Sequence, residues 1–499
     1  MKRTVYQVYT RLFGNKNTTD KFDGTLEENG IGKFHDFTPV ALAAIKDLGI
    51  THLWFTGVIE HATMAKDPPQ VVKGRAGSPY AITDYYQVNP ELAKVGANRM
   101  NEFKALVERT HAAGLAVVID FVPNHVARTN VNFGDADDTS VAFAPNNNFY
   151  YLPGQDFVVP TGYQPPVAPD PNWNESPAKA TGNDVFSASP TLDDWFETAK
   201  LNYGVDLQNG RATHFFPPPD TWLRMAEILA YWTRLGVDGF RCDMAEMVPA
   251  EFWGWVIPIV KKTNPRLVFI AEIYNPDAYE RYLTEGQFDL LYDKVGLYDS
   301  LRDVIEGRAE VGKIVASHQR VERLQSRLLN FLENHDEQRL ASRFFAGDPE
   351  VGRPALVVST CLGQGSQMVY FGQEVGEPGL GAQGFSGENG RTSMFDYTCV
   401  PEHQKWMNGG KFDGGGLSPA QKSLRGFYRD LLHLASTSEL LAKGTTTIVP
   451  TGSPLALAWH REWGGEKRLF AANFDLKQGV DFTVEGLPVH LDPLGYHLG

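Results

Sequence analysis

Four acidic residues stand at the ends of four short apolar runs, and no other feature of this sequence says as much about its chemistry. They are Asp120 in VVIDFVPNH, Asp243 in DGFRCD, Glu272 in VFIAE and Asp336 in NFLENHD. An apolar run that stops at a carboxylate is typical of a buried strand that brings a charge to a surface. Because a carboxylate is costly to remove from water unless it is paired or used, four of them indicate one shared site.

Carboxylates held close together cannot all ionise easily, so one is expected to have a raised pKa. A protonated carboxyl beside an ionised one is the pair of groups that can cleave a glycosidic bond. Arg241 lies two residues before Asp243, so both side chains point to the same side of a strand. Its guanidinium would keep Asp243 ionised, which makes Asp243 the nucleophile and Glu272 the acid/base. The alternative for Arg241 is a plain salt bridge at a strand end.

Two histidines and one asparagine flank these carboxylates. His125 and His335 both lie next to acidic segments, and an imidazole there can bind sugar hydroxyls. A zinc site needs three or four ligands at suitable spacing, which two histidines so far apart in sequence do not supply. Asn124 is a candidate ligand for a hard cation, and a structural role for it at a strand end is the alternative.

A repeated phrase of amphipathic helix, glycine and short strand predicts the elements that position these groups. TPVALAAIKDLG followed by ITHLWF is its first copy, with Thr38 as N-cap and Pro39 in the first turn. Buried strands alternating with helices indicate parallel βαβ units, and eight of them favour a (β/α)8 barrel, an α/β fold. No G-x-G-x-x-G follows the first strand, which argues against a doubly wound nucleotide-binding sheet. The predicted strands are 5–9, 52–55, 116–121, 239–243, 268–272, 290–292, 329–333 and 367–370.

The spacing of these strands divides the chain into three parts. The barrel is predicted over residues 1–125 and 206–440. Residues 126–205, rich in Pro, Asn, Gly and Asp, are too long for an ordinary loop and are predicted to form an inserted domain B after the third strand. Short alternating runs with turn signals over 441–499 predict a C-terminal antiparallel β domain.

Composition narrows the class of partner. The 499 residues carry a net charge of −14, which argues against nucleic acid or an anionic membrane as the main partner. Three cysteines without a C-x-x-C pattern indicate neither a disulfide framework nor a zinc cluster. The first residues contain no apolar h-region and the sequence contains no run of roughly 20 apolar residues, so we expect neither a signal peptide nor a membrane span. We therefore expect a cytoplasmic protein that binds a neutral substrate, and the sequence leaves its oligomeric state open.

The same segments resemble those of a known family, the α-amylase superfamily or glycoside hydrolase family 13. DFVPNH, GFRCD, the glutamate that ends the fifth strand, and NHD resemble its four signature segments, in the right order and on the right strands. SPYAITDYYQVNP resembles the stretch after strand 2, NYGVDL the segment that closes domain B, and GQGSQMVYFGQE the strand 8 segment. The resemblance covers nearly the whole chain.

The resemblance implies a retaining mechanism with a covalent glycosyl-enzyme intermediate. Asp243 would be the nucleophile and Glu272 the acid/base, while Asp336 would bind hydroxyls of the sugar at the cleavage point and help to distort it. The residues that would support this subsite are Arg241, His125, His335, Asp120 and Tyr80, whose ring would stack on that sugar. No cofactor is needed for this chemistry.

One segment departs from the family pattern. Many α-amylases follow the nucleophile with a Lys-His pair that binds the leaving-group side and, through a backbone carbonyl, calcium. Here Glu246 and Met247 stand at those positions. A structural calcium ion is therefore doubtful, and so are the usual contacts to the acceptor.

The expected activity is hydrolysis of α-1,4-glucosidic bonds in maltooligosaccharides or related α-glucans. Transfer of the sugar to another sugar is the alternative within the family, because hydrolysis and transfer share one covalent intermediate. Specificity for α-1,6 links, sucrose or trehalose also stays open, as does endo or exo action. A binding or scaffold protein on the same fold would be expected to lack catalytic carboxylates, and all three are present here.

Overall fold

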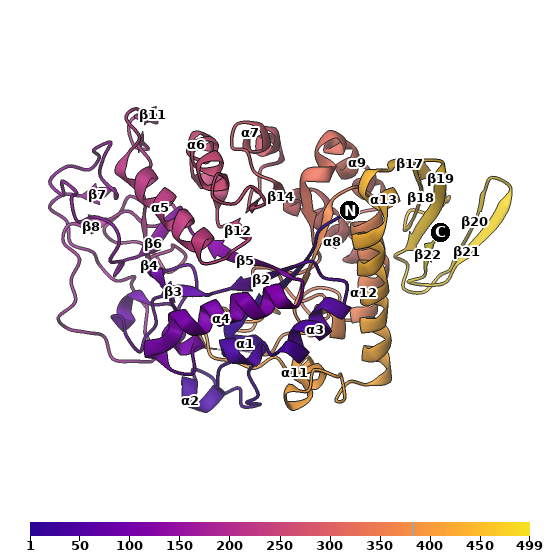
Figure 1. Cartoon of the computed structure of the whole chain (residues 1–499), viewed down its shortest axis with the longest axis horizontal. Helices are drawn as coiled ribbons and strands as arrows, with labels where there is room; N and C mark the ends of the chain where they lie inside the picture. The colour runs from indigo at the N-terminus through magenta and orange to yellow at the C-terminus, as the bar shows by residue number, and fades with distance from the viewer. Residues whose placement is uncertain (382–383) are drawn as a thin grey trace.

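The computed structural model describes residues 1–381 and 384–499, and its centre is a closed barrel of eight parallel strands (Figure 1). Around the barrel the strands follow the order β1, β16, β15, β14, β13, β12, β5, β2. This confirms the predicted (β/α)8 barrel. The strands are β1 (Thr4–Tyr9), β2 (His52–Thr56), β5 (Ala116–Phe121), β12 (Gly239–Cys242), β13 (Val268–Ala271), β14 (Leu290–Tyr292), β15 (Leu328–Asn330) and β16 (Ser366–Tyr370).

Alternation along each strand separates an inner core from an outer one. Val118 and Ile270 belong to a small cluster that fills the barrel, while Ile119 packs in the large cluster beneath the helices. Successive strand residues face opposite sides, so a residue two positions beyond an inner one also points inward. Asp120 follows Val118 by two positions, and Glu272 follows Ile270 by two. The barrel therefore aims both carboxylates at its own axis.

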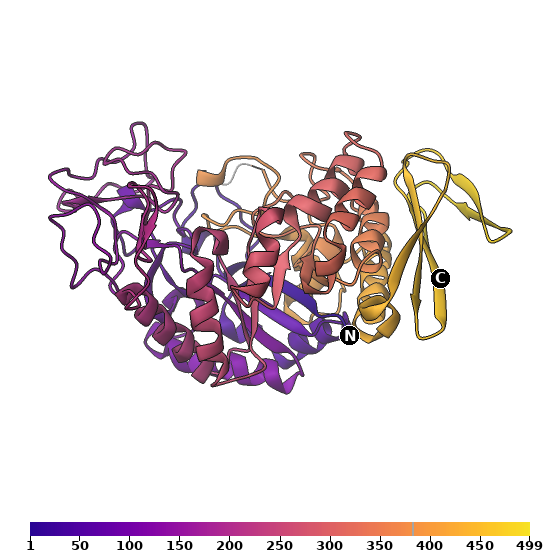
Figure 2. The same ribbon diagram turned by 90° about the horizontal axis from the view of Figure 1, so that it is seen from above.

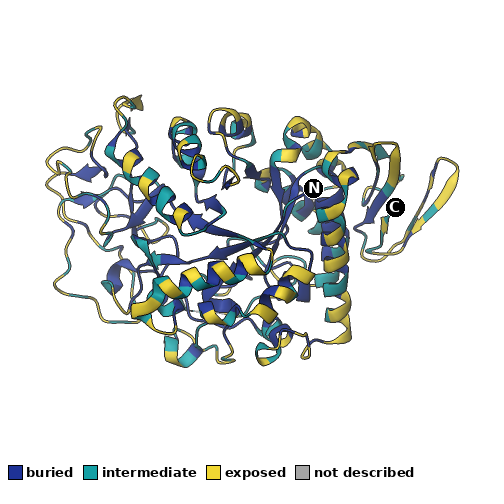
Figure 3. Ribbon diagram, viewed as in Figure 1, coloured by how far each residue is buried: buried dark blue, intermediate teal, exposed yellow. Residues whose placement is uncertain are grey.

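Helices surround the barrel, and most of them expose one face, while the barrel strands are buried (Figure 3). The first copy of the repeated phrase begins as predicted, because the Thr38 side chain accepts a hydrogen bond from the Ala41 amide and Pro39 occupies the first turn. Among the described residues, the α-helices of six or more residues are α3 (Pro39–Asp47), α4 (Arg99–Ala112), α5 (Asp220–Arg234), α6 (Ala250–Lys261), α7 (Tyr279–Thr284), α8 (Asp299–Ile305), α9 (Gly312–Arg320), α10 (Gly352–Cys361), α11 (Pro401–Met407) and α12 (Pro419–Thr437).

A long segment with little regular structure lies between β5 and α5. Two of its strands form one antiparallel pair, in which His125 of β6 lies opposite Lys200 of β9. The short pair of β7 with β8 lies between them in sequence, and the pair of β10 with β11 follows before the chain returns to the barrel. The strands of this segment are β6 (His125–Ala127), β7 (Tyr151–Leu152), β8 (Ala178–Lys179), β9 (Thr198–Lys200), β10 (Val205–Asp206) and β11 (Ala212–Thr213).

The chain closes with antiparallel strands at the opposite end of the molecule from this segment (Figures 1 and 2). β17, β18, β19 and β22 form one sheet, and β20 pairs with β21. Trp459 and Arg461 hold the sheet to the end of α10 by donating hydrogen bonds to the Cys361 and Leu362 carbonyls. The strands are β17 (Thr445–Val449), β18 (Ala456–Trp463), β19 (Glu466–Asn473), β20 (Val480–Val484), β21 (Leu487–Leu491) and β22 (Tyr496–Leu498).

The described residues include neither a membrane-spanning helix nor an exposed thiol. Among the described residues, no helix combines the length and the apolar character needed to cross a bilayer. Cys242, Cys361 and Cys399 are all buried free thiols. Burial raises the pKa of each thiol, to about 12 for Cys361 and Cys399, so the thiols are held in the unreactive protonated form.

Candidate active site

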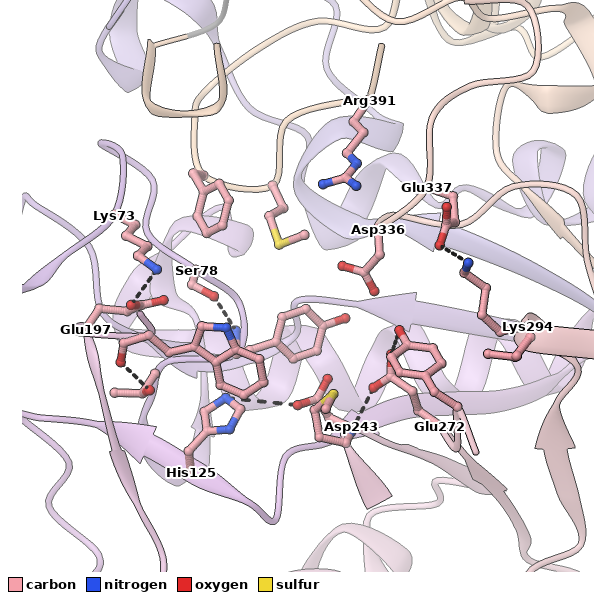
Figure 4. Close-up of a pocket in the computed structure, with 18 residues that line it drawn as sticks. Lys73, Ser78, His125, Glu197, Asp243, Glu272, Lys294, Asp336, Glu337 and Arg391 are labelled. Atoms are coloured by element: carbon pink, nitrogen blue, oxygen red, sulfur yellow. Dashed lines mark hydrogen bonds and ion pairs between the residues drawn. The ribbon is translucent and has the colours of Figure 1, made fainter. Parts of the chain in front are cut away.

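A pocket of about 630 Å³ opens at the carboxyl end of the barrel strands (Figure 4). Most of the predicted site residues line it, namely Tyr80, His125, Asp243, Glu272 and Asp336. Asp120, Arg241 and His335 do not line the pocket, but each contacts a residue that does, namely Tyr80, Asp243 and Asp336 respectively. The structure thus brings together all of the predicted catalytic and substrate-binding side chains, from five strands or the loops that follow them.

Arg241 is the centre of this arrangement, because its guanidinium contacts all four carboxylates that the sequence singles out. Nη1 donates a hydrogen bond to Asp243 Oδ1 at 2.5 Å and lies 3.5 Å from Asp120 Oδ1. Nη2 lies 2.9 Å from Glu272 Oε2 and 4.0 Å from Asp336 Oδ2. Strand register explains the first of these contacts, since Arg241 lies directly opposite Asp120 in the pair of β12 with β5.

Arg241 has no exposed surface, so water screens the interaction of its charge with neighbouring groups only weakly. Three aromatic rings surround the guanidinium, with Cζ 5.4 Å from the Trp54 ring centroid, 5.3 Å from Tyr80 and 5.7 Å from Tyr292. A cation over ring faces is favourable, and more so when water is excluded. One buried cation among four carboxylates is therefore the main electrostatic feature of the pocket.

Burial and Arg241 act in opposite directions on the carboxyls. Burial raises the pKa of Asp243 well above its ordinary value, and Arg241 opposes that rise. Burial also raises the pKa of Asp336, with Arg241 and then Arg391 opposing, and it raises the pKa of Asp120 to about 6. Loss of Arg241 would therefore shift all three carboxyls towards their protonated, neutral form.

Asp120 serves as an anchor for the ring system under the pocket. Trp54 Nε1 donates to one of its oxygens at 3.1 Å, and the Tyr80 hydroxyl donates to the other at 3.4 Å. Tyr80 also stacks on His335, with ring centroids 5.2 Å apart and planes inclined by 27°. These contacts fix the Tyr80 ring as one face of the pocket, the position in which it could support a sugar.

Both predicted histidines are held neutral. Burial lowers the pKa of His335 well below its ordinary value, with Arg241 next, and burial followed by Lys200 and Lys73 lowers the pKa of His125 to about 3. His335 Nε2 lies 3.2 Å from Asp336 Oδ2, and His125 Nε2 lies 4.0 Å from Asp243 Oδ2. Neutral imidazoles here can orient carboxylates and bind hydroxyls without adding charge.

The surroundings of Asn124 do not fit the predicted metal ligand. Its Oδ1 accepts a hydrogen bond from the buried Lys200 ammonium, and its Nδ2 donates to the Gly182 carbonyl at 2.8 Å. Lys200 Nζ also lies 2.7 Å from Asp184 Oδ1. An ammonium thus takes the place beside these oxygens that a cation would need. Nor do the residues described in the structure include any group of three or more His, Cys, Asp or Glu that could hold a metal ion.

We expect the Lys200 ammonium, and not a metal ion, to stabilise the segment around Asn124. Excess EDTA is expected to leave the unfolding temperature unchanged, because Lys200 joins β9 to Asn124 without a metal. Lys200→Met should lower the free energy of unfolding by about 1–3 kcal/mol, the cost of an unsatisfied buried acceptor. Lys179→Met is the matched control, since Lys179 makes a looser 3.4 Å contact in the same segment. A fall in unfolding temperature with EDTA would contradict this assignment.

Several pocket residues were not predicted from the sequence. Lys73 and Glu197 form a buried ion pair at 3.0 Å on the left of Figure 4, and Lys294 and Glu337 form a partly exposed pair at 3.3 Å on the right. The Trp195 ring lies 5.2 Å from the His125 ring. Spacing gives no signal for partners that are over a hundred residues apart, such as Lys73 and Glu197.

Tyr274 is the missed residue closest to the chemistry. It lines the pocket, and its hydroxyl donates a hydrogen bond to Glu272 Oε1 at 2.7 Å. Its position two residues after Glu272 was the available signal, because residues two apart beyond a strand can share one side.

Comparison with known proteins agrees with this geometry. A family model described as the alpha amylase catalytic domain matches residues 7–395. The chain therefore belongs to the α-amylase family, as its four signature segments predict.

Among curated relatives, the chain is 24% identical over 389 residues to "Alpha-amylase MalA" of Haloarcula japonica, covering 75% of this chain and 44% of that protein. It is 22% identical over 492 residues to "Alpha-amylase 3" of Dictyoglomus thermophilum, covering 94% and 84%. Among solved structures, the cyclic alpha-maltosyl-(1→6)-maltose hydrolase from Arthrobacter globiformis matches with a TM-score of 0.69 at 18% identity, covering 99% and 97%. This likeness shows the fold. The chain spans less than half the length of MalA.

Proposed function

We propose that this protein is a retaining glycoside hydrolase that cleaves α-1,4-glucosidic bonds in maltooligosaccharides or related α-glucans. The observation that carries the proposal is the contact of Asp243 and Glu272 with one buried guanidinium. A retaining enzyme needs its two carboxyl groups close together, about 5–5.5 Å apart. Asp243 and Glu272 contact the two Nη atoms of one guanidinium, which supports a short separation of this kind.

In the first step the Asp243 carboxylate attacks the anomeric carbon while Glu272 gives its proton to the leaving oxygen. Arg241 favours the charged form of Asp243 that attack requires, because its guanidinium opposes the rise in the pKa of Asp243 that burial causes. In the second step Glu272 takes a proton from water, and the water oxygen displaces Asp243 from the sugar. Asp336 and the neutral His335, which lie 3.2 Å apart, would bind hydroxyls of the same sugar.

The pocket and the relatives support this substrate class. The pocket has the size of a ligand site, and charged pairs lie to both sides of the carboxylates (Figure 4). The relatives are named alpha-amylase, cyclomaltodextrinase and maltase, which favours short α-linked glucose chains. We expect the chemistry to require no cofactor. We place the protein in the cytoplasm, a reducing compartment in which free cysteines persist, and cell fractionation tests that placement.

The test is a panel of substrates with product analysis. Maltotriose, maltotetraose, isomaltose, sucrose and trehalose are incubated with the protein, and proton NMR follows the anomeric signals of the first products. We expect turnover of the maltooligosaccharides, with α-anomers formed first. β-Anomers formed first would contradict the retaining mechanism. Activity on sucrose or isomaltose with none on maltotriose would overturn the α-1,4 assignment.

Chromatography of the maltotriose reaction separates hydrolysis from transfer. Only products shorter than the substrate are expected if water is the acceptor. Products longer than maltotriose would instead assign the protein as a transglycosylase, because another sugar would have attacked the same intermediate. The Asp243→Asn protein is the control for both assays, since it keeps the shape of the pocket but lacks the nucleophile.

A further inference from the structure

Glu272 has different partners on its two carboxylate oxygens. Oε2 accepts a hydrogen bond from the Met244 backbone amide at 2.7 Å and lies 2.9 Å from Arg241 Nη2. Oε1 accepts a hydrogen bond from the Tyr274 hydroxyl at 2.7 Å. Met244 aims its amide at Glu272 from a left-handed backbone conformation, φ +43°, directly after Asp243. The carboxylate is thus held from both sides in one orientation.

The donors on Oε2 determine which oxygen carries the proton. An amide N–H and a guanidinium can donate but cannot accept, so a proton on Oε2 would face two other donors. A hydroxyl can both donate and accept, so a proton on Oε1 finds a partner in Tyr274. When Glu272 is protonated, the proton therefore belongs on Oε1, and Tyr274 is its neighbour.

We propose that Tyr274 is a positioning residue of the reaction, which turns Oε1 of Glu272 towards the leaving oxygen and favours the ionised form of Glu272 after the proton has left. This inference rests on the proposed function and deepens it. In the first step the Oε1–H bond breaks and an O–H bond forms on the leaving oxygen, while the bond from the anomeric carbon to that oxygen is replaced by a bond to Asp243. Tyr274 then donates its hydroxyl to the ionised Oε1.

The second step reverses the proton movement. A water O–H bond breaks, its proton returns to Oε1, and the water oxygen replaces Asp243 on the anomeric carbon. Tyr274 keeps its own proton in both steps, because burial and the carboxylates of Glu272 and Asp336 raise the pKa of its hydroxyl far above the working range. It therefore acts through Glu272 and transfers no proton itself.

Other charged and titratable groups face Glu272 and remain unchanged in the test. They come from several elements around the barrel end, namely Arg241 of β12, Asp243 after β12, Tyr292 of β14, and His335 and Asp336 after β15. Because none of these is altered by a substitution at Tyr274, a change in pH dependence can be assigned to the lost hydroxyl.

The experiment compares wild type with Tyr274→Phe in the pH dependence of kcat/KM on maltotriose. Without the hydroxyl, the ionised form of Glu272 loses a donor, so the alkaline limb should move upward by about one pH unit, the size expected for a hydrogen bond to a charged group. We expect kcat on maltotriose to fall roughly tenfold. The rate of glycosylation by α-glucosyl fluoride should stay near wild type, because fluoride leaves without a proton from Glu272.

Tyr282→Phe is the matched control, because the Tyr282 hydroxyl bonds only backbone carbonyls, those of Glu246 and Val248. The Tyr282→Phe variant should show the alkaline limb of its kcat/KM profile at the same pH as the wild-type protein. An unmoved limb in Tyr274→Phe, or an equal loss on maltotriose and α-glucosyl fluoride, would overturn the positioning role.

A second measurement does not depend on turnover. In protein labelled with ¹³C at the glutamate carboxyls, the resonance missing from Glu272→Gln reports Glu272, and it should titrate at higher pH in Tyr274→Phe than in wild type. No shift would refute the role of Tyr274 even if the enzyme is active. A shift in a protein without glycosidase activity would keep the contact and refute the proposed function.

Discussion

Asp243→Asn is expected to lower kcat on maltooligosaccharides by about 10⁴-fold or more, the scale seen when a nucleophilic residue is removed. The asparagine keeps the size of the side chain and an oxygen that can accept from Arg241, which lies 2.5 Å from Asp243 Oδ1. It cannot form the ester with the sugar. The loss should therefore appear in kcat without a comparable loss of folding, measured by steady-state kinetics and by thermal unfolding.

Asp293→Asn provides the matched control for this substitution. Asp293 is also a buried aspartate directly after a barrel strand, β14, but it accepts a hydrogen bond from the Leu297 amide and lies outside the catalytic pocket. The kcat of the Asp293→Asn variant should stay close to that of the wild-type protein. If Asp243→Asn keeps kcat within about tenfold of wild type, Asp243 is not the nucleophile.

Arg241→Met is expected to abolish activity and to lower the free energy of unfolding by about 3–5 kcal/mol, the range for breaking a buried ion pair from one side. Four carboxylates would remain near one another without their cation. Because their charges would then be costly, the groups should take up protons at a higher pH than in wild type. Chemical denaturation at several pH values measures this effect.

The sign of the pH effect follows from Asp120. Its pKa is raised from 3.8 to about 6 in the folded protein, so the native state binds this proton more tightly than the unfolded chain. That contribution to stability is fully present below about pH 4 and is lost as the pH rises through about 6. Without Arg241 the carboxyl groups should keep their protons to a higher pH. The pH range in which protonation stabilises the folded state should therefore extend upward, so Arg241→Met should be more stable at about pH 5 than at about pH 8.

Arg461→Met separates this effect from the loss of any buried arginine. Arg461 is fully buried in the C-terminal sheet, but it bonds backbone carbonyls and the Thr446 hydroxyl instead of carboxylates. The variant should lose stability, keep its activity, and show no gain in stability at low pH relative to wild type. An Arg241→Met protein with the same pH dependence as Arg461→Met would contradict the electrostatic role.

The barrel and its carboxylates could be predicted because local pattern and strand geometry determine them. Residues such as Val118 and Asp120 are two apart on one strand, so a buried strand places them on the same side whatever else the chain does. The order of eight such strands then sets the neighbours of each, and Arg241 meets Asp120 through register alone.

Contacts between segments without fixed spacing could not be predicted. The ammonium of Lys200 beside Asn124 depends on how the inserted segment returns to β6, and nothing local to Asn124 signals it. Asp336 was predicted as a site residue, but the direction of its side chain was not, because it follows β15 by several residues and depends on a turn in which the Asn334 side chain accepts from the Asp336 amide. The domain limits at residues 125, 205 and 440 stay predictions.

The pairing of β6 with β9 has a consequence for how this protein could change over time. The chain leaves the barrel after β5 and comes back through a strand that lies beside its point of departure. Because both ends are fixed to each other, added or lost residues between them cost little additional chain entropy and do not alter the register of the eight strands. Residues 128–197 are therefore a region in which a new specificity could arise by insertion or exchange, with the catalytic carboxylates left in place.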